Sequence, residues 1–364
     1  MILTKYKLGE ILDVTRGASL SGEYYATEGE YIRLTCGNFD YQNNCFKENK
    51  SKDNLYYVGD FKSEFLMEEG DIITPLTEQA IGLLGSTAII PESGKYIQSQ
   101  DVAKIICKED LLDKDFAFYL ISSALVKQQL SAAAQQTKIR HTSPDKIKDC
   151  TVWIPELSEQ KRIGKLLRSI DRKIELNRAI NQNLEAMAKQ LYDYWFVQFD
   201  FPNEEGKPYK SSGGEMVWNE KLKRKIPNEW DNCKLKDFIN LFDSKRIPLS
   251  SKDREERKGN YPYYGATGIM DYVNEYIFDG DYILLAEDGS TSDSKGFPIV
   301  QYIWGKNWVN NHAHIILPKN EQYLMFTYQM LRSIPAKQIE TGSIQKKISQ
   351  ETSVSIIWYY LIQF

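Results

Sequence analysis

The chain has 364 residues, which predicts two or three domains, because a single hydrophobic core rarely grows beyond ~250–300 residues. Its 42% hydrophobic and 26% charged residues, with a mean hydropathy of -0.48, exclude a disordered chain and a membrane-embedded one. The formal net charge of -4 excludes a uniformly basic surface, so any phosphate-binding region must come from local segregation of charge.

The first segment, residues 1–155, is predicted to be a domain of short strands, then a helix near 112–131, then a polar loop at 135–141. Its first seven residues lack the apolar core of an export signal, and no apolar run in the chain approaches the ~20 residues that span a bilayer. The five cysteines are scattered without a Cys-x-x-Cys pair, which predicts neither a disulfide framework nor a zinc knuckle. We therefore expect a protein of the reducing cytoplasm, with no membrane anchor.

A long helix is predicted from residue 158 to about 198, within a central segment of 156–200. Pro155 precedes it, Ser158 is placed to cap it, and Glu159 suits the positive end of the helix dipole. Residues then recur at alternating steps of four and three, the spacing of a coiled-coil seam that needs a partner helix. The seam is Ile163, Leu167, Ile170, Ile174, Asn177, Asn181, Leu184, Ala188, Leu191 and Trp195. Asn177 and Asn181 either fix the register of a buried seam or face solvent, and both interpretations stay open.

The same helix is locally basic. Between 161 and 178 there are seven basic and two acidic residues, which indicates a solvated face or a contact with phosphate or protein. About 40 residues at ~1.5 Å each make a rod of roughly 60 Å, longer than one small domain covers.

Residues 201–229 are predicted to be a linker, because 203–214 is rich in turn formers, and residues 230–364 a second domain. The two flanks are similar in sequence. At an offset of 210, residues 70–73 match 280–283, 103–106 match 313–316, and 116–123 match 326–333, while Lys7 and Leu8 match Lys234 and Leu235 at an offset of 227. Matches in the same order predict two diverged copies of one domain.

Few residues suit catalysis. The three histidines are His141, His312 and His314; the last two share a strand face but have no further Cys or His nearby, which favours hydrogen bonding over zinc. There is no phosphate-binding P-loop, no Gly-x-Gly-x-x-Gly and no Gly-x-Ser-x-Gly motif. A metal-dependent nuclease built around Asp281, Glu287 and Asp288 is the remaining catalytic alternative. The chain is predicted to recognise a ligand rather than to catalyse a reaction.

Specific motifs surround the central helix. It begins Ile-Pro-Glu-Leu-Ser-Glu-Gln at 154–160, and residues 187–202 read Met-Ala-Lys-Gln-Leu-Tyr-Asp-Tyr-Trp-Phe-Val-Gln-Phe-Asp-Phe-Pro. An Ile-Pro-Asn-Glu-Trp motif follows at 226–230. With the two flanking copies, these motifs resemble the specificity subunit of type I restriction-modification systems. The resemblance covers nearly the whole chain and is most specific in the helix.

The resemblance implies an α+β protein in which two similar α/β target-recognition domains are joined by a long coiled-coil-forming helix. It implies a non-catalytic reader of a bipartite, asymmetric site in double-stranded DNA, serving defence against foreign DNA. Partner methyltransferase subunits would methylate adenine and partner restriction subunits would cleave. S-adenosylmethionine, ATP and Mg would belong to those partners, and no cofactor is expected in this chain.

Polar loops with local positive charge are the candidate DNA contacts, since donors and acceptors read base edges and cations bind phosphate. In the first copy they are Gln135, Gln136, Thr137, Lys138, Arg140 and His141; in the second they are Asn310, Asn311, His312, Ser343, Gln345, Lys346 and Lys347. Glu287 and Asp288 are candidate acceptors for cytosine amino groups. The alternative for each is an ordinary solvated loop.

The C-terminal segment departs from the resemblance. A complete member would have a second long helix filling the seam of the first, but the match ends near Ile348, and 349–364 lacks the Pro-x-x-x-x-Gln start of such a helix. We expect a truncated or altered terminus without that helix, and a seam that pairs with another copy, a separate fragment or a methyltransferase helix, or else a poorly soluble chain. The alternative function is a coiled-coil scaffold for protein interactions without DNA specificity.

Overall fold

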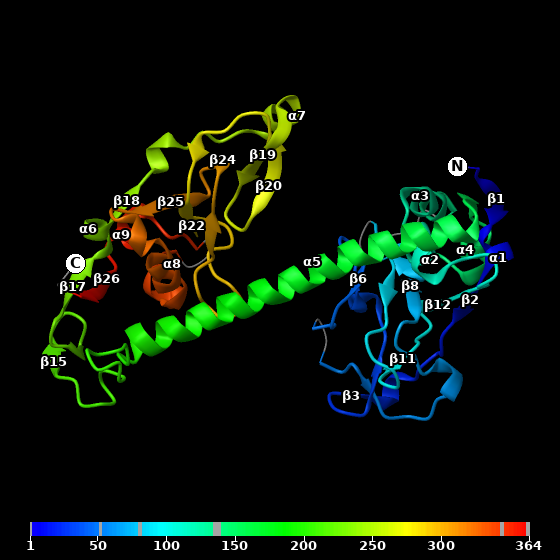
Figure 1. The fold of residues 1–364 in the computed structure, drawn as a ribbon, viewed down its shortest axis with the longest axis horizontal. Coiled ribbons are helices and arrows are strands. Elements are labelled where there is room, and N and C mark those ends of the chain that lie inside the picture. The colour runs from blue at the N-terminus through cyan, green and yellow to red at the C-terminus, as the bar shows by residue number, and fades with distance from the viewer. Residues whose placement is uncertain (1, 51–52, 79–81, 134–139, 343–345, 362–364) are drawn as a thin grey trace. The chain divides into compact units, whose positions relative to one another are not determined.

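The computed structural model describes residues 2–50, 53–78, 82–133, 140–342 and 346–361 (Figure 1). The chain divides into two compact units, Met1–Arg178 and Ala179–Phe364. One continuous helix, α5 (Leu157–Tyr192), begins in the first unit and ends in the second. The expected α+β class, with two similar domains and a long helix, is confirmed.

The first unit is built on a four-stranded sheet of order β10-β8-β12-β2, beside a second four-stranded sheet of order β11-β4-β7-β3. Strands β1 and β14 form a separate antiparallel pair. Its elements are β1 (Thr4–Lys7), α1 (Leu8–Ile11), β2 (Leu12–Arg16), β3 (Tyr25–Ala26), β4 (Tyr31–Arg33), β5 (Phe39–Asp40), β6 (Cys45–Phe46), β7 (Tyr56–Tyr57), β8 (Ile72–Pro75), β9 (Thr77–Glu78), β10 (Ala88–Ile89), β11 (Tyr96–Ile97), β12 (Val102–Cys107), α2 (Lys114–Ile121), α3 (Ala124–Ala133), β13 (Arg140–His141), α4 (Pro144–Lys148) and β14 (Thr151–Ile154).

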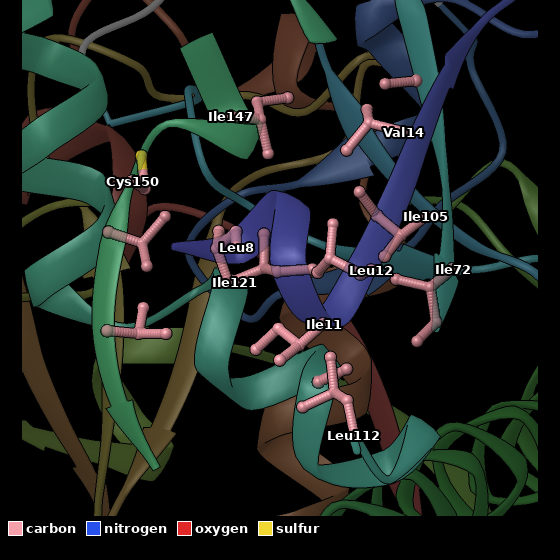
Figure 2. Close-up of a cluster of buried hydrophobic side chains, with 14 of the residues drawn as sticks. Leu8, Ile11, Leu12, Val14, Ile72, Ile105, Leu112, Ile121, Ile147 and Cys150 are labelled. Atoms are coloured by element: carbon pink, nitrogen blue, oxygen red, sulfur yellow. The ribbon is translucent and has the colours of Figure 1, made fainter. Parts of the chain in front are cut away.

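The main sheet of this unit is buried on both faces, because alternate residues of a strand point to opposite sides. Ile72 and Ile105 face the core that contains Leu12, Leu112 and Ile121 (Figure 2). The neighbouring strand residues Ile73 and Val102 lie in the core on the other face.

The second unit repeats this architecture. Its main sheet has the order β23-β22-β25-β18, and β17 pairs with β26 as β1 pairs with β14. Its elements are β15 (Met216–Asn219), β16 (Arg224–Pro227), β17 (Trp230–Lys234), α6 (Leu235–Phe238), β18 (Ile239–Leu241), α7 (Ser251–Glu256), β19 (Lys258–Tyr264), β20 (Ile269–Val273), β21 (Phe278–Asp279), β22 (Tyr282–Ala286), β23 (Val300–Ile303), β24 (Lys306–Val309), β25 (Ala313–Pro318), α8 (Leu324–Ser333), α9 (Gln350–Val354) and β26 (Ile357–Leu361).

The strand register corrects the sequence offset between the copies. Ile72 lies opposite Ile105 in the first sheet, and Ile283 lies opposite Ile316 in the second, so equivalent residues are 211 apart. The offset of 210 is therefore wrong by one residue for these strands. A one-residue slip moves every side chain to the other face of the sheet.

The segment after Ile348 also differs from expectation. Ser349 caps α9 as Ser143 caps α4, each accepting a hydrogen bond from the backbone three residues on. The amide of Leu235 donates to the Ile356 carbonyl at 2.8 Å, as that of Leu8 donates to Cys150 at 2.9 Å. Helix α9 and strand β26 thus correspond to α4 and β14, and the prediction that the repeat ends near Ile348 is wrong.

The predicted linker contains ordered structure. Strands β15 and β16 form a hairpin, and Phe199, Ile226 and Trp230 form a small core beside it. Phe201 stacks on Trp230 with ring centroids 5.2 Å apart. These contacts join residues that are distant in sequence, so the content of turn-forming residues, from which the linker was predicted, did not indicate them.

Helix α5 begins at Leu157 and therefore places Ser158 inside its first turn, where the hydroxyl donates to the Glu156 carboxylate at 2.7 Å. The predicted Ser158 cap is wrong, whereas Glu159 does lie in the first turn. A wider π-helical turn, Asp193–Val197, follows the end of α5. Among the described helices, none has the length and hydropathy needed to cross a membrane.

Candidate nucleic-acid interface

Three loops meet at the same edge of the main sheet in each unit. In the first, the amide of Leu76 donates to the Asp101 carbonyl at 2.8 Å, and the amide of Thr142 donates to Leu76 at 2.9 Å. In the second, Glu287 donates to His312 and Ile348 to Glu287, both at 2.8 Å. Thr142 and Ile348 are therefore equivalent, and the polar loops predicted at 135–141 and 341–347 lie directly before them in the two copies.

In the first unit the cluster is formed by Thr77, Asp101 and His141. The Thr77 hydroxyl lies 3.4 Å from Asp101 Oδ1 and 3.4 Å from His141 Nδ1. Strand β13 pairs with β9, which places Arg140 opposite Glu78, and His141 is exposed. The candidates Gln135, Gln136, Thr137 and Lys138 lie outside the described residues, so their roles stay predictions.

In the second unit the equivalent positions carry Asp288, His312 and Lys347. His312 Nδ1 lies 2.6 Å from Asp288 Oδ1, and the His312 side chain is 45% exposed. Asn311 is also exposed. These groups offer hydrogen-bonding atoms at the surface, as a base-reading site requires.

Asn310 does not lie at that surface. It is 3% exposed, its Oδ1 accepts from the amide of His312 at 2.8 Å, and its Nδ2 lies 3.3 Å from the sulfur of Met270. We therefore correct its predicted role from a base reader to a residue that shapes the turn carrying His312.

The two loop lysines are already paired. Lys346 lies 3.1 Å from Glu340 and Lys347 lies 3.0 Å from Glu287, and both acids are largely buried. Backbone bonds between Thr341 and Lys347 close the loop, and Gly342 adopts a left-handed φ of 87°. Ser343 and Gln345 lie outside the described residues. Both lysines remain half exposed, so they are still accessible to a phosphate.

The sequence interpretation missed a buried network beneath these loops. The side chains of Asp243, Glu287 and His314 each bring one oxygen or nitrogen atom to within 4.8 Å of the others. Cations of the chain already contact both carboxylates: Arg246 donates to Glu287 at 2.7 Å and lies 3.5 Å from Asp243. No local pattern indicated this network, because Asp243 and His314 are 71 residues apart.

Burial, charges and hydrogen bonds shift the pKa values of the three residues in this network. Burial alone lowers the pKa of His314, but hydrogen bonds to Asp243 and the Ile348 carbonyl, with the charges of Asp243 and Glu287, outweigh burial and raise it. Burial alone raises the pKa of Asp243, but hydrogen bonds from His314 and the Ile315 amide hold it below its usual range. Hydrogen bonds from Arg246 and Lys347 likewise outweigh burial at Glu287 and lower its pKa.

The predicted carboxylate cluster does not assemble. Asp281 precedes β22 and accepts a hydrogen bond from Tyr302 at 3.0 Å, while Glu287 and Asp288 follow the same strand. A five-residue strand separates the two ends by about 16 Å. This geometry contradicts the nuclease alternative, and His312 and His314 each pair with a different acid.

The helix seam is largely exposed. Ile170, Ile174, Leu184 and Leu191 are 46%, 42%, 57% and 47% exposed, and Asn177 and Asn181 are exposed too. Ile163, Leu167, Ala188 and Trp195 are partly buried near the two ends of the helix. Within the described residues no second long helix covers this stripe, so in this chain the two asparagines face solvent.

Two residues attach α5 to the first unit: Gln160, which ends the motif at 154–160, and Gly164, which the sequence analysis did not single out. The Gln160 side chain is buried and bonds the Asp113 amide at 3.1 Å and the carbonyls of Leu111 and Pro155 at 3.1 and 2.9 Å. At Gly164 an added Cβ would lie 2.7 Å from the Phe116 amide nitrogen. The close approach of α5 to α2 therefore requires glycine there.

Two copies of one α/β domain, each with a polar loop cluster at the same sheet edge, define a two-domain recognition protein. The chain belongs to the type I restriction modification DNA specificity domain family, whose model matches residues 3–186 and 227–353. It is similar to a putative type I restriction enzyme specificity subunit of Haemophilus influenzae, with 35% identity over 131 residues, 36% of this chain and 32% of that relative. It is also similar to the MjaIX specificity subunit of Methanocaldococcus jannaschii, with 24% identity over 150 residues, 41% of this chain and 32% of that relative.

The segments matched in these relatives thus span about a third of the relatives' length. The fold is also that of a solved protein. The crystal structure of the type I restriction-modification S subunit from M. genitalium matches with a TM-score of 0.60 and 19% identity, over 99% of this chain and 84% of that one.

Proposed function

We propose that this chain is the sequence-specific DNA recognition subunit of a type I restriction-modification complex and reads a bipartite, asymmetric site. The observation that carries the proposal is the pair of equivalent loop clusters with different chemistry. Thr77, Asp101 and His141 occupy the positions that Asp288, His312 and Lys347 occupy in the second unit. One fold presenting different donors and acceptors twice suits two different half-sites.

The chain directs chemistry that its partners perform. Methyltransferase subunits would methylate adenine and restriction subunits would cleave, with S-adenosylmethionine, ATP and Mg bound by those subunits. The net charge of -4 supports this division, because a chain without excess positive charge binds DNA weakly by itself.

Helix α5 bounds the separation of the half-sites. Its 36 residues at ~1.5 Å each give about 54 Å, or about 16 base pairs at ~3.4 Å per pair. A separation set by α5 alone therefore leaves a short stretch of unread sequence between two half-sites of a few base pairs each.

Selection of bound duplexes from a random library, with methyltransferase subunits present, tests the proposal. His141→Ala is expected to change the preferred bases in one half-site only, and His312→Ala in the other half-site only. Lys5→Ala and Lys223→Ala, exposed positions outside the loop clusters, serve as controls and should leave both half-sites unchanged. A contiguous palindrome, or the same change from both histidine variants, would overturn the proposal.

The exposed seam of α5 favours a second candidate, a coiled-coil scaffold without DNA specificity. The same selection separates the two functions. A scaffold would enrich no sequence, with or without the methyltransferase subunits.

A further inference from the structure

The buried network of the second unit has no counterpart at the equivalent positions of the first, all of which the structure describes. By the register of the two sheets, Asp243, Glu287 and His314 correspond to Arg16, Leu76 and Ala103. Ala103 lies opposite Arg16 on paired strands, and Leu76 is 3% exposed in an apolar core. At these three described positions, the second copy therefore has interacting ionisable groups and the first copy does not.

His314 uses both ring nitrogens. It is 1% exposed, Nε2 lies 2.8 Å from the Ile348 carbonyl, and Nδ1 lies 2.6 Å from Asp243 Oδ2. A carbonyl oxygen only accepts hydrogen bonds, so Nε2 carries a proton. With a carboxylate at Nδ1, the arrangement is that of an imidazolium donating from both sides.

This imidazolium and its neighbours hold the two loops of the cluster. The Ile348 carbonyl accepts from His314, and the adjacent Lys347 pairs with Glu287 at 3.0 Å. Arg246 donates to Glu287 and, at 2.8 Å, to the Ala313 carbonyl. The network thus connects Lys347, Ile348 and the turn at 310–313 to the sheet.

We propose that His314, as an imidazolium between Asp243 and the Ile348 carbonyl, is the positioning residue for the DNA-reading loops of the second unit. DNA reading by the second unit, but not by the first, therefore depends on one buried proton. The proposal rests on the proposed function. The groups that face His314 are Asp243, Glu287 and the Ile348 carbonyl, and Arg246 and Lys347 neutralise the acids.

The direction of the pH effect follows from the pKa shifts. The folded pKa of His314 is raised, so its stabilisation is complete below the unfolded value of about 6.5 and is lost as pH rises through the folded value. The pKa values of Asp243 and Glu287 are lowered, so their contribution is present above about pH 4 and is lost as pH falls through their folded values. The loops are therefore held between these limits and released on the alkaline side.

Two measurements on the full chain without DNA test the positioning. Three histidines make the ¹⁵N-imidazole spectrum simple, and the resonance that is missing in His314→Gln should remain that of an imidazolium above pH 6.5. Hydrogen exchange at the amides of Lys347 and Ile348, corrected for intrinsic rates, should accelerate at least tenfold between pH 6.5 and 9. Thr142, the first-unit counterpart of Ile348, is the internal control and should not respond.

The DNA measurement compares the two half-sites, so that general effects of pH cancel. Preference for the half-site read by the second unit should fall at least tenfold from pH 6.5 to 9, while the other stays constant. His314→Gln keeps a donor but not the charge and should remove this pH dependence. If that variant does not fold, Asp243→Asn should move the transition to lower pH.

Each outcome decides one question. An intact preference at both half-sites from pH 6.5 to 9, or a His314 resonance that titrates at or below 6.5, overturns the role of His314. A shift of the His314 resonance on adding zinc would make the cluster a cation site and would also overturn it. No sequence preference at any pH overturns the proposed function instead, while the exchange measurement still reports on the loops.

Discussion

Gly164 shows how one residue determines the attachment of a long helix. Alanine normally favours a helix over glycine by about 1 kcal/mol. Here, however, a Cβ would meet the Phe116 amide nitrogen at 2.7 Å and Asp113 Oδ1 at 2.9 Å. Backbone atoms cannot move aside cheaply, so the steric effect exceeds the propensity.

We therefore expect Gly164→Ala to lower the free energy of unfolding of the first unit by about 1–3 kcal/mol, the usual effect of overpacking. Urea unfolding followed by circular dichroism measures the change. Ala179→Gly on the exposed part of α5 is the matched control and should lower it by no more than about 1 kcal/mol. A stabilised Gly164→Ala variant would show that α5 does not approach α2 so closely.

The lysines of the second loop give a further prediction at this scale. Because Lys346 pairs with the buried Glu340, Lys346→Gln alone leaves an uncompensated acid and should loosen the loop. The double variant Lys346→Gln, Glu340→Gln removes both charges. If Lys346 contacts a phosphate, the slope of log affinity against log salt should fall in magnitude by about 0.9 in the double variant. An unchanged slope in a binding titration would exclude that contact.

At the scale of elements, α5 combines two faces. One face holds the helix to the two units at its ends. Gln160, near the start, bonds the first unit, and Tyr192, the last residue, lies in the core of the second unit. The seam between them stays exposed over Ile174 and Leu184. An apolar stripe of this length is typical of a surface that another helix covers.

Leu184→Glu is therefore expected to leave the unfolding free energy of the chain nearly unchanged, because the side chain is 57% exposed. The same change should abolish self-association or methyltransferase binding through the seam. Sedimentation velocity, alone and with methyltransferase subunits, measures both. Gln182→Glu, about 200° around the helix, is the control and should not alter association. Equal association of both variants would show that the seam is not the contact surface.

At the scale of the whole molecule, two reading units and one helix predict that the spacing of the half-sites can be changed without changing their sequences. Inserting seven residues between Arg178 and Ala179 preserves the seam repeat and lengthens the helix by about 10.5 Å, or about 3 base pairs. The selected site should keep both half-site sequences and gain about 3 unread pairs. Altered half-site sequences would argue that α5 takes part in reading rather than in spacing.

The sequence by itself determined what depends on local periodicity and on similarity within the chain. The predicted start at 158 lies one residue from the start of α5, and the predicted end near 198 lies one residue beyond the π-helical turn that follows α5, because a helix is made by contacts between near neighbours. The repeated segments predicted two copies of one domain, and the motifs around the helix placed the chain in its family.

Only the tertiary structure decided which distant residues meet. It set the 211-residue register of the sheets, paired β26 with β17, and brought Asp243, Arg246 and Glu287 around His314. It also turned Asn310 inward while leaving His312 at the surface. The physical reason is that strand pairing and charge burial join residues far apart in the chain, so their partners follow from packing and not from neighbouring sequence.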